Sequence, residues 1–260
     1  PQIEIVRLLF ERLNLSGEYQ RWQVVTKDVR AFSIVDMIVY CINNLEFERC
    51  VELLEELEQY IDLDNAINEQ YRKRIEISIE LGQKKIEQKD AKNKFKEILE
   101  YTIPFEIVTG YGEKYLTNTE ILCLLNVAVY ADDLEKNLAL ETLINLCIQM
   151  EQDEGILEHI AVWEIVMTNV ANICGDVGNY SKSDSISLKI MKECIFCNRM
   201  NMLDFAFYIN VWNFRERKKK NIPVTQGYQE KDCLKKCIAL CQINKNTARE
   251  KRMKDRLAIL

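Results

Sequence analysis

The sequence predicts an all-α protein, a right-handed solenoid of about five helical hairpins. The chain of 260 residues holds only 8 Gly and 3 Pro, so the residues that punctuate sheets are scarce. Apolar residues recur every three or four positions, the spacing of one helix face. The second helix of each hairpin is expected to begin near residue 46, 89, 133, 179 or 227. This period, slightly over forty residues, indicates hairpins that stack and bury each other's faces.

The first fifteen residues form an amphipathic segment behind a proline, which suits a first helical turn. Ile3, Val6, Leu9 and Leu13 share one face. The segment resembles the last helix of a lambda-repressor-like (XRE-type) helix-turn-helix domain. That resemblance implies a recognition helix upstream of Pro1. The alternative is a helix that caps the solenoid.

The first two hairpins are expected between Asp28 and Thr102. The first pairs residues 28–43 with a helix beginning at Leu45. The second pairs residues 64–83 with residues 89–102, and Pro104 ends it because proline cannot continue the helical hydrogen-bond ladder. Residues 105–116 are expected to be the longest connection.

The third and fifth hairpins follow the same pattern. Thr117-Asn118-Thr119-Glu120 predicts a capping box, from which helix 118–130 leads through a tight turn into helix 134–149. The fifth hairpin pairs residues 202–219 with residues 228–243. We therefore expect three parts: 1–15 as the remnant head helix, 28–246 as the repeat domain and 247–260 as a capping helix.

The fourth hairpin, residues 155–197, is the most complete repeat unit. Gly175 and Gly178 are expected to bracket its turn, since glycine readily adopts the left-handed conformation that closes a helix. The segment resembles a tetratricopeptide unit in its small residue Ala171, its turn Gly178-Asn179-Tyr180 and its small residue Ser183. Cys50 and Ala91 stand at similar small positions, where close helix crossings leave little room. HEAT-like pairs share the same period.

A series of asparagines is the candidate ligand site. Asn126-Val127, Asn169-Val170 and Asn210-Val211 recur at intervals of 43 and 41 residues on the first helices. Because each Val belongs to a buried stripe, each Asn is expected to face the inner, concave side. A carboxamide can bond both the N–H and the C=O of an extended peptide. Three such asparagines on successive first helices would span about six or seven residues of an extended peptide. The alternative is that these side chains bond between helices or face solvent. In the peptide-binding interpretation, Asn172 and Asn213 lie one helical turn after Asn169 and Asn210 and assist them in binding the peptide.

The 10 cysteines lie within apolar helical stripes and are expected to be reduced and buried in an intracellular chain. Cys194-x-x-Cys197 and the Cys233, Cys237, Cys241 series have the reach for a thiolate metal site. Their core spacing favours packing instead, so no metal and no cofactor are predicted.

The charged and catalytic residue types argue against an enzyme. The one histidine, His159, excludes a multi-histidine site, and no phosphate loop or nucleophile motif is present. The Glu52–Glu58 run is interpreted as a solvated helix face. The basic runs 215–220 and 249–252 stand at helix C-termini or alternate with acids, which favours helix-dipole interactions over nucleic acid. The net charge is −6, and no apolar run approaches the roughly 20 residues that span a membrane.

An XRE-like helix followed by five hairpins resembles the peptide-sensing transcriptional regulators of Gram-positive bacteria, the RRNPP superfamily, including Rgg-type members. The resemblance implies a cytoplasmic homodimer in quorum sensing, whose repeat domain binds a short linear peptide and which contacts DNA only through an N-terminal head missing here. The alternative is a tetratricopeptide-type adaptor that holds a protein partner. The upstream sequence would discriminate the two.

Overall fold

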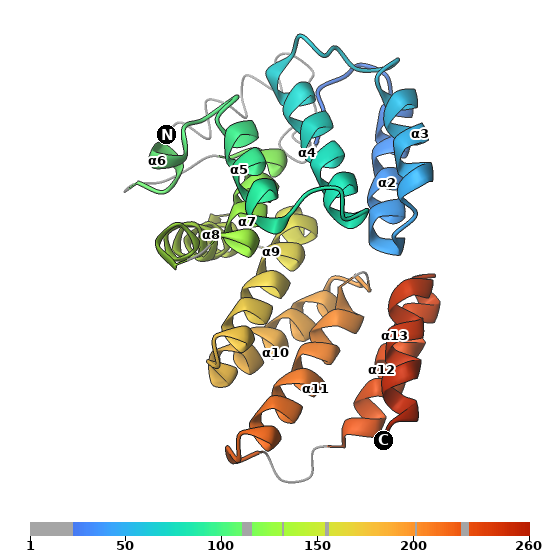
Figure 1. Ribbon diagram of the computed structural model, residues 1–260, viewed down its shortest axis with the longest axis vertical. Helices are drawn as coiled ribbons and strands as arrows, with labels where there is room; N and C mark the ends of the chain where they lie inside the picture. Colours follow the sequence, from blue (N-terminus) through green and yellow to red (C-terminus); the bar gives the residue numbers. More distant parts are fainter. Residues whose placement is uncertain (1–22, 111–115, 132, 154–155, 201, 225–228) are drawn as a thin grey trace. The chain divides into compact units, whose positions relative to one another are not determined.

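The computed structural model describes residues 23–110, 116–131, 133–153, 156–200, 202–224 and 229–260 (Figure 1). These described residues form helices and contain no strand, which confirms the predicted all-α class. The predicted head helix, residues 1–15, lies outside them. Helical segments begin close to the expected period, with second helices starting at Phe47, Gln88, Asp133, Tyr180 and Glu230.

The helices group into two compact units. The first unit ends at Tyr130 and the second begins at Ala131, except that residues 43–45 group with the second unit. This boundary falls inside the third predicted hairpin, so its two helices belong to different units. The first of them is buried around most of its circumference, from Ile121 to Leu125 and again at Val127 and Ala128. A helix that is apolar on nearly every side packs against several neighbours of its own unit.

The first unit contains six described helices: α2 (Arg30–Asn44), α3 (Phe47–Leu57), α4 (Ala66–Gly82), α5 (Gln88–Leu99), α6 (Phe105–Val108) and α7 (Asn118–Tyr130). Helix α4 packs against α3, α5 and α7, and α5 also packs against α7. The short α6 lies within the connection expected over 105–116. It forms after Pro104 because Phe105 and Val108 are buried one turn apart.

The capping box at the start of α7 is confirmed. The Glu120 backbone N–H donates to Thr117 Oγ1 at 3.2 Å, and the Thr117 backbone N–H donates to Glu120 Oε2 at 2.7 Å. Two amide groups that a helix N-terminus leaves without intrahelical partners are thus satisfied reciprocally. The local sequence therefore defines where α7 begins.

The second unit also contains six described helices: α8 (Asp133–Asp153), α9 (Ile156–Asp176), α10 (Tyr180–Phe196), α11 (Leu203–Lys219), α12 (Glu230–Ile243) and α13 (Thr247–Ala258). Each helix packs against the next along the chain (Figure 1). The first helices of two successive hairpins, α9 and α11, also contact each other. This is the arrangement expected for stacked helical hairpins.

The predicted small positions lie at tight crossings. Ala171 and Ser183 are fully buried, and the Ser183 hydroxyl donates to the Ala171 carbonyl at 2.7 Å across α9 and α10. Cys50 and Ala91 are also fully buried. Cys50 occupies the same kind of place, with its thiol 3.9 Å from the Ile38 carbonyl.

The two glycines of the fourth hairpin have different roles. Gly178 adopts a φ of 84°, so it closes α9 as expected. Gly175 instead lies inside the last turn of α9, where a Cβ would stand 2.8 Å from Asn213 Oδ1 and 3.0 Å from the Trp212 ring. It still bounds the predicted turn, because the Gly178 N–H donates to its carbonyl at 2.9 Å, but only Gly178 adopts the left-handed conformation. The position requires glycine because α11 approaches closely.

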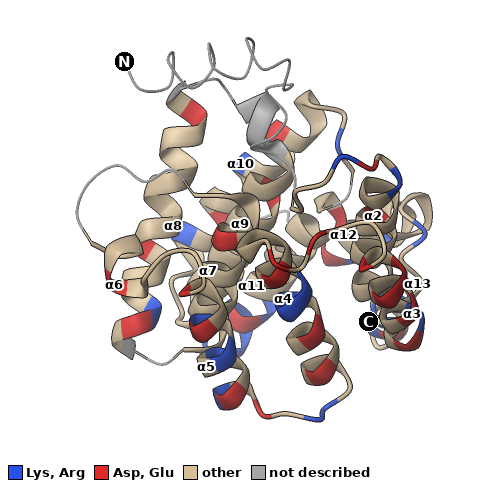
Figure 2. Cartoon of the chain, turned by 90° about the horizontal axis from the view of Figure 1, so that it is seen from above, with Lys and Arg blue, Asp and Glu red and all other residues tan. Residues whose placement is uncertain are grey.

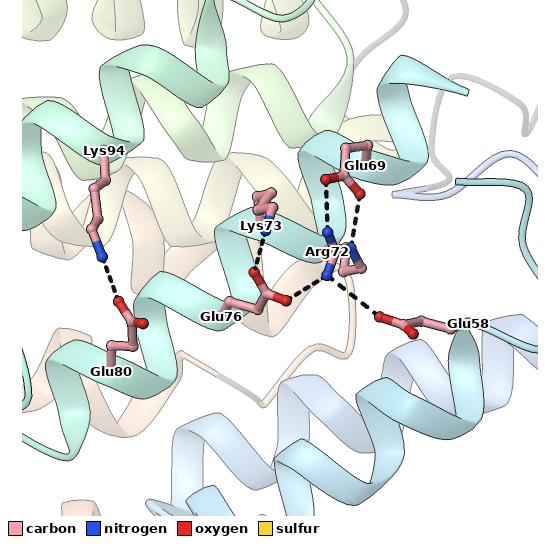
Figure 3. A network of polar contacts seen from close by, with 7 residues as sticks. All are labelled: Glu58, Glu69, Arg72, Lys73, Glu76, Glu80 and Lys94. Carbon is pink, nitrogen blue, oxygen red and sulfur yellow. Dashed lines mark hydrogen bonds and ion pairs between the residues drawn. The ribbon is translucent and has the colours of Figure 1, made fainter. Parts of the chain in front are cut away.

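Helix α4 carries a network of ion pairs along one face (Figure 3). Arg72 lies 3.6 Å from Glu58, 2.7 Å from Glu69 and 2.6 Å from Glu76. Glu80 reaches Lys94 of α5 at 2.7 Å. The network therefore links α4 to both α3 and α5. Both α4 and α5 carry acidic and basic residues (Figure 2).

Candidate functional site

The five candidate asparagines are distributed over three first helices. Asn126 lies on α7 of the first unit, Asn169 and Asn172 lie on α9, and Asn210 and Asn213 lie on α11. Because α9 and α11 pack against each other, the second unit brings its candidates onto two adjacent helices. Four of the side chains are half-buried, and Asn213 is fully buried.

Asn126 and Asn169 retain most of their hydrogen-bonding capacity. The Asn126 carboxamide makes no hydrogen bond to any described residue. Asn169 donates one N–H to the Ile165 carbonyl of its own helix at 2.9 Å, which leaves a donor and the amide oxygen. Neither side chain bonds to a neighbouring helix, so both can serve a ligand.

Asn172 and Asn210 retain less of this capacity. Asn172 Nδ2 donates to Asp176 Oδ2 at 3.3 Å, a weak contact along the same helix. Asn210 Nδ2 donates to Ser187 Oγ at 2.9 Å and to the Ala206 carbonyl at 3.4 Å. One donor is used by Ser187 of α10 and the other by Ala206 of its own helix, so only its amide oxygen is left to accept a bond.

Asn213, the other predicted assisting residue, uses its donors between helices. Its side chain donates to Ser183 Oγ at 2.8 Å and to Asp184 Oδ1 at 2.7 Å, both on α10. Its oxygen is buried against Gly175. Both Asn210 and Asn213 donate to α10, as expected for one side of α11. Asn213 also lies against Gly175 of α9 and is buried, whereas Asn210 is half-buried.

Most of the cysteines lie in the core, as the apolar spacing predicted. All ten are free thiols, and seven are buried. Burial, with a contribution from Glu164, raises the pKa of Cys194 to about 12. No group of three metal-ligating side chains occurs among the described residues. Burial raises the pKa of each of the seven buried thiols, which are therefore un-ionised core groups at neutral pH.

The acidic and basic runs lie on helix faces, as interpreted. Glu52, Glu55 and Glu56 are exposed along α3. In the basic runs, Arg217 pairs with Asp184 at 2.7 Å and Arg249 pairs with Asp204 at 2.9 Å. These guanidinium groups hold helices together, so they are not free for phosphate contacts.

Two buried acid–arginine clusters in the second unit were missed by sequence reasoning. Glu164 accepts hydrogen bonds from Arg199 at 2.7 Å and from the Cys194 thiol at 3.5 Å. Asp204 accepts from Arg249 at 2.9 Å and from the Cys241 thiol at 3.3 Å. Both carboxylates are almost fully buried. The available signal was an acidic residue within an apolar stripe.

Helix α4 holds a further buried group that the sequence did not single out. Tyr71 and Arg74 share the buried face, one turn apart, and Tyr71 is fully buried. A charged residue at a core-stripe position was again the signal that could have identified it.

Comparisons with known proteins supply no family for this chain. No protein-family model matches it, and no curated protein matches it. None of the helices in the described part of the chain is long and apolar enough to cross a membrane.

Proposed function

We propose that this chain is the ligand-sensing region of a bacterial transcriptional regulator of the RRNPP type, and that its first helices bind a short linear peptide through the peptide backbone. The observation that carries the proposal is the unused hydrogen-bonding capacity of Asn126 and Asn169. Half-buried carboxamides with free donors and acceptors suit an extended peptide, whose backbone groups need partners when they leave water.

The proposed contacts differ from one asparagine to another. Asn169 of the second unit bonds both the N–H and the C=O of the peptide, and Asn126 of the first unit has the same bonding capacity. Asn210 contributes only an acceptor, because its donors are occupied by Ser187 and Ala206. Asn172 assists beside Asn169. A homodimer and a DNA-binding head that includes residues 1–15 complete the proposed regulator.

Replacement of Asn169 by Ala is the direct test. We expect the affinity for peptide to fall by about 1–3 kcal/mol, because peptide amides would be left buried without partners. Isothermal titration calorimetry with synthetic peptides encoded beside the gene measures this loss. The matched control is Asn93→Ala, since Asn93 is exposed on the second helix α5.

Two outcomes would overturn the proposal. Equal affinities of the Asn169→Ala variant and the parent protein would remove the asparagines from the binding site. Absence of any peptide binding, together with stable capture of a folded protein partner, would instead favour the adaptor function.

A further inference from the structure

Arg74 is a buried cation without a counter-ion in the described part of the chain. The residue is 8% exposed. Its Nη2 donates to the neutral Gln23 Oε1 at 3.0 Å, and its guanidinium lies 5.4 Å from the centre of the Tyr71 ring. Its Nε is buried and has no hydrogen-bond partner among the described residues. Burial of a charge is costly unless the charge is paired and hydrogen-bonded, so this arrangement needs an explanation.

Arg72, on the same helix, differs from Arg74 in its ion-pair partners. Arg72 has three carboxylates within 3.6 Å (Figure 3). Two residues further along α4, Arg74 faces the interior and has none within ion-pair distance among the described residues. Acidic side chains are therefore abundant on α4, but they stand on its other face.

The geometry of the Arg74 contact fits a carboxylate better than it fits an amide. Arginine Nε and Nη2 point along one edge of the guanidinium and can donate two parallel hydrogen bonds. The Gln23 amide has a single oxygen, which reaches Nη2 and leaves Nε unpaired. A carboxylate has two coplanar oxygens and would satisfy both nitrogens.

The backbone around Gln23 is held independently of its side chain. The Thr119 hydroxyl donates to the Gln23 carbonyl at 3.0 Å. Asn68 accepts from the Val25 N–H at 2.7 Å and donates to the Val25 carbonyl at 2.9 Å. The Gln23 side chain can therefore swing away without releasing the segment from α4 and α7.

We propose that Arg74 is a carboxylate-binding site, in which the Gln23 amide oxygen occupies one of the two positions that ligand carboxylate oxygens take. The ligand class is a peptide with an acidic side chain or a free C-terminal carboxylate. This inference rests on the proposed function, because it assigns a charged anchor to the same peptide. The location is consistent with that role, since α4 packs directly against α7, the helix that carries Asn126.

Cys123 connects these two helices. The positive charge of Arg74 acts on the Cys123 thiol, although burial dominates and raises its pKa to about 12. Asn126 follows Cys123 by three residues on α7, and residues at this spacing are neighbours on a helix surface. Arg74 and Asn126 are thereby placed in one neighbourhood of the first unit.

The first arm of the test needs no ligand. Gln23→Glu supplies a carboxylate from the protein itself, and Gln23→Ala supplies none. We expect the melting temperature of Gln23→Glu to exceed that of Gln23→Ala by about 2–4 °C or more. The difference should vanish in an Arg74→Gln background and persist in an Arg72→Gln background. An equal difference in the Arg74→Gln background would overturn the site.

The second arm uses an array of synthetic octapeptides, each made with Asp or Asn and with a free or amidated C-terminus. We expect one of these neutralisations to weaken binding about tenfold or more, and Arg74→Gln to abolish its effect. If the change from Asp to Asn weakens binding, the bound carboxylate is that side chain. If amidation weakens binding, the bound carboxylate is the C-terminus. Peptides that bind regardless of charge would overturn the inference and leave the proposed function standing. If no peptide binds while Gln23→Glu stabilises the protein through Arg74, the peptide function fails and the carboxylate site stands.

Discussion

The two units differ in how a buried charge is paired, since the buried charges are the carboxylates Glu164 and Asp204 in the second unit and the guanidinium of Arg74 in the first. In the second unit, Arg199 is paired with Glu164 at 2.7 Å and Arg249 with Asp204 at 2.9 Å. In the first unit, Arg74 donates to the neutral amide of Gln23 and lies beside the Tyr71 ring. These two buried carboxylates of the second unit are thus neutralised by arginines of the chain, whereas Arg74 has no counter-ion among the described residues.

A buried charge that has a counter-ion from the chain serves the structure, whereas a buried charge without one is available to bind a ligand. A buried pair with completed hydrogen bonds stabilises a particular packing and has little left to offer a ligand. A buried guanidinium with a vacant edge favours any anion that reaches it. The three predictions below test this contrast, in order of decreasing expected effect.

The largest effect is expected for Asp204→Ala. The change leaves the Arg249 guanidinium largely buried without its counter-ion and also removes the acceptor of the Cys241 thiol. The expected loss in the free energy of unfolding is about 3–5 kcal/mol. Urea denaturation followed by circular dichroism measures it. Asp232→Ala is the control, because the Asp232–Lys235 pair on α12 is exposed. Equal losses in the two variants would show that the buried pair has no special role.

An intermediate effect is expected for Ala171→Leu, which tests whether the second unit is as tightly packed as its charge pairs imply. Ala171 is fully buried beside Ser183, so a larger side chain must separate α9 from α10. The expected loss is about 1–3 kcal/mol. Ala161→Leu makes the same change at an exposed position of α9 and should cost less than about 0.5 kcal/mol. A melting temperature unchanged by Ala171→Leu would contradict the close crossing.

The smallest effect is expected for Arg74→Met. The replacement removes a buried charge that has no counter-ion among the described residues, and the side-chain stem keeps much of its packing. The free energy of unfolding should change by less than about 1 kcal/mol in either direction. Chemical denaturation of this variant beside Asp204→Ala makes the comparison direct. A loss similar to that of Asp204→Ala would mean that Arg74 has a structural partner, as Arg249 does.

Much of the local structure could be predicted from the sequence. The capping box at Thr117 and Glu120 formed as expected, and the turn at Gly178 closed α9. The small residues Cys50, Ala91, Ala171 and Ser183 lie at buried positions. These features depend on residues close together in the chain or on helical spacing, which the sequence displays directly.

The candidate site was less predictable. Asn172 and Asn213 occupy corresponding positions of α9 and α11, but Asn172 bonds only its own helix, whereas Asn213 is enclosed by Ser183, Asp184 and Gly175. Whether a polar side chain is free to bind a ligand depends on which residues of the neighbouring helix lie opposite it and can form hydrogen bonds with it. Helical periodicity defines a face and contains no information about the neighbour.

The sequence by itself determined the all-α class, the hairpin period and the helix ends, because these follow from apolar spacing, capping residues and the few glycines and prolines. Tertiary structure decided the division at Ala131, the burial of Asn213 and which arginines have counter-ions. Each of these depends on contacts between residues distant in the chain. Arg72 and Arg74 differ by only two positions, yet one faces three carboxylates and the other faces a single amide oxygen.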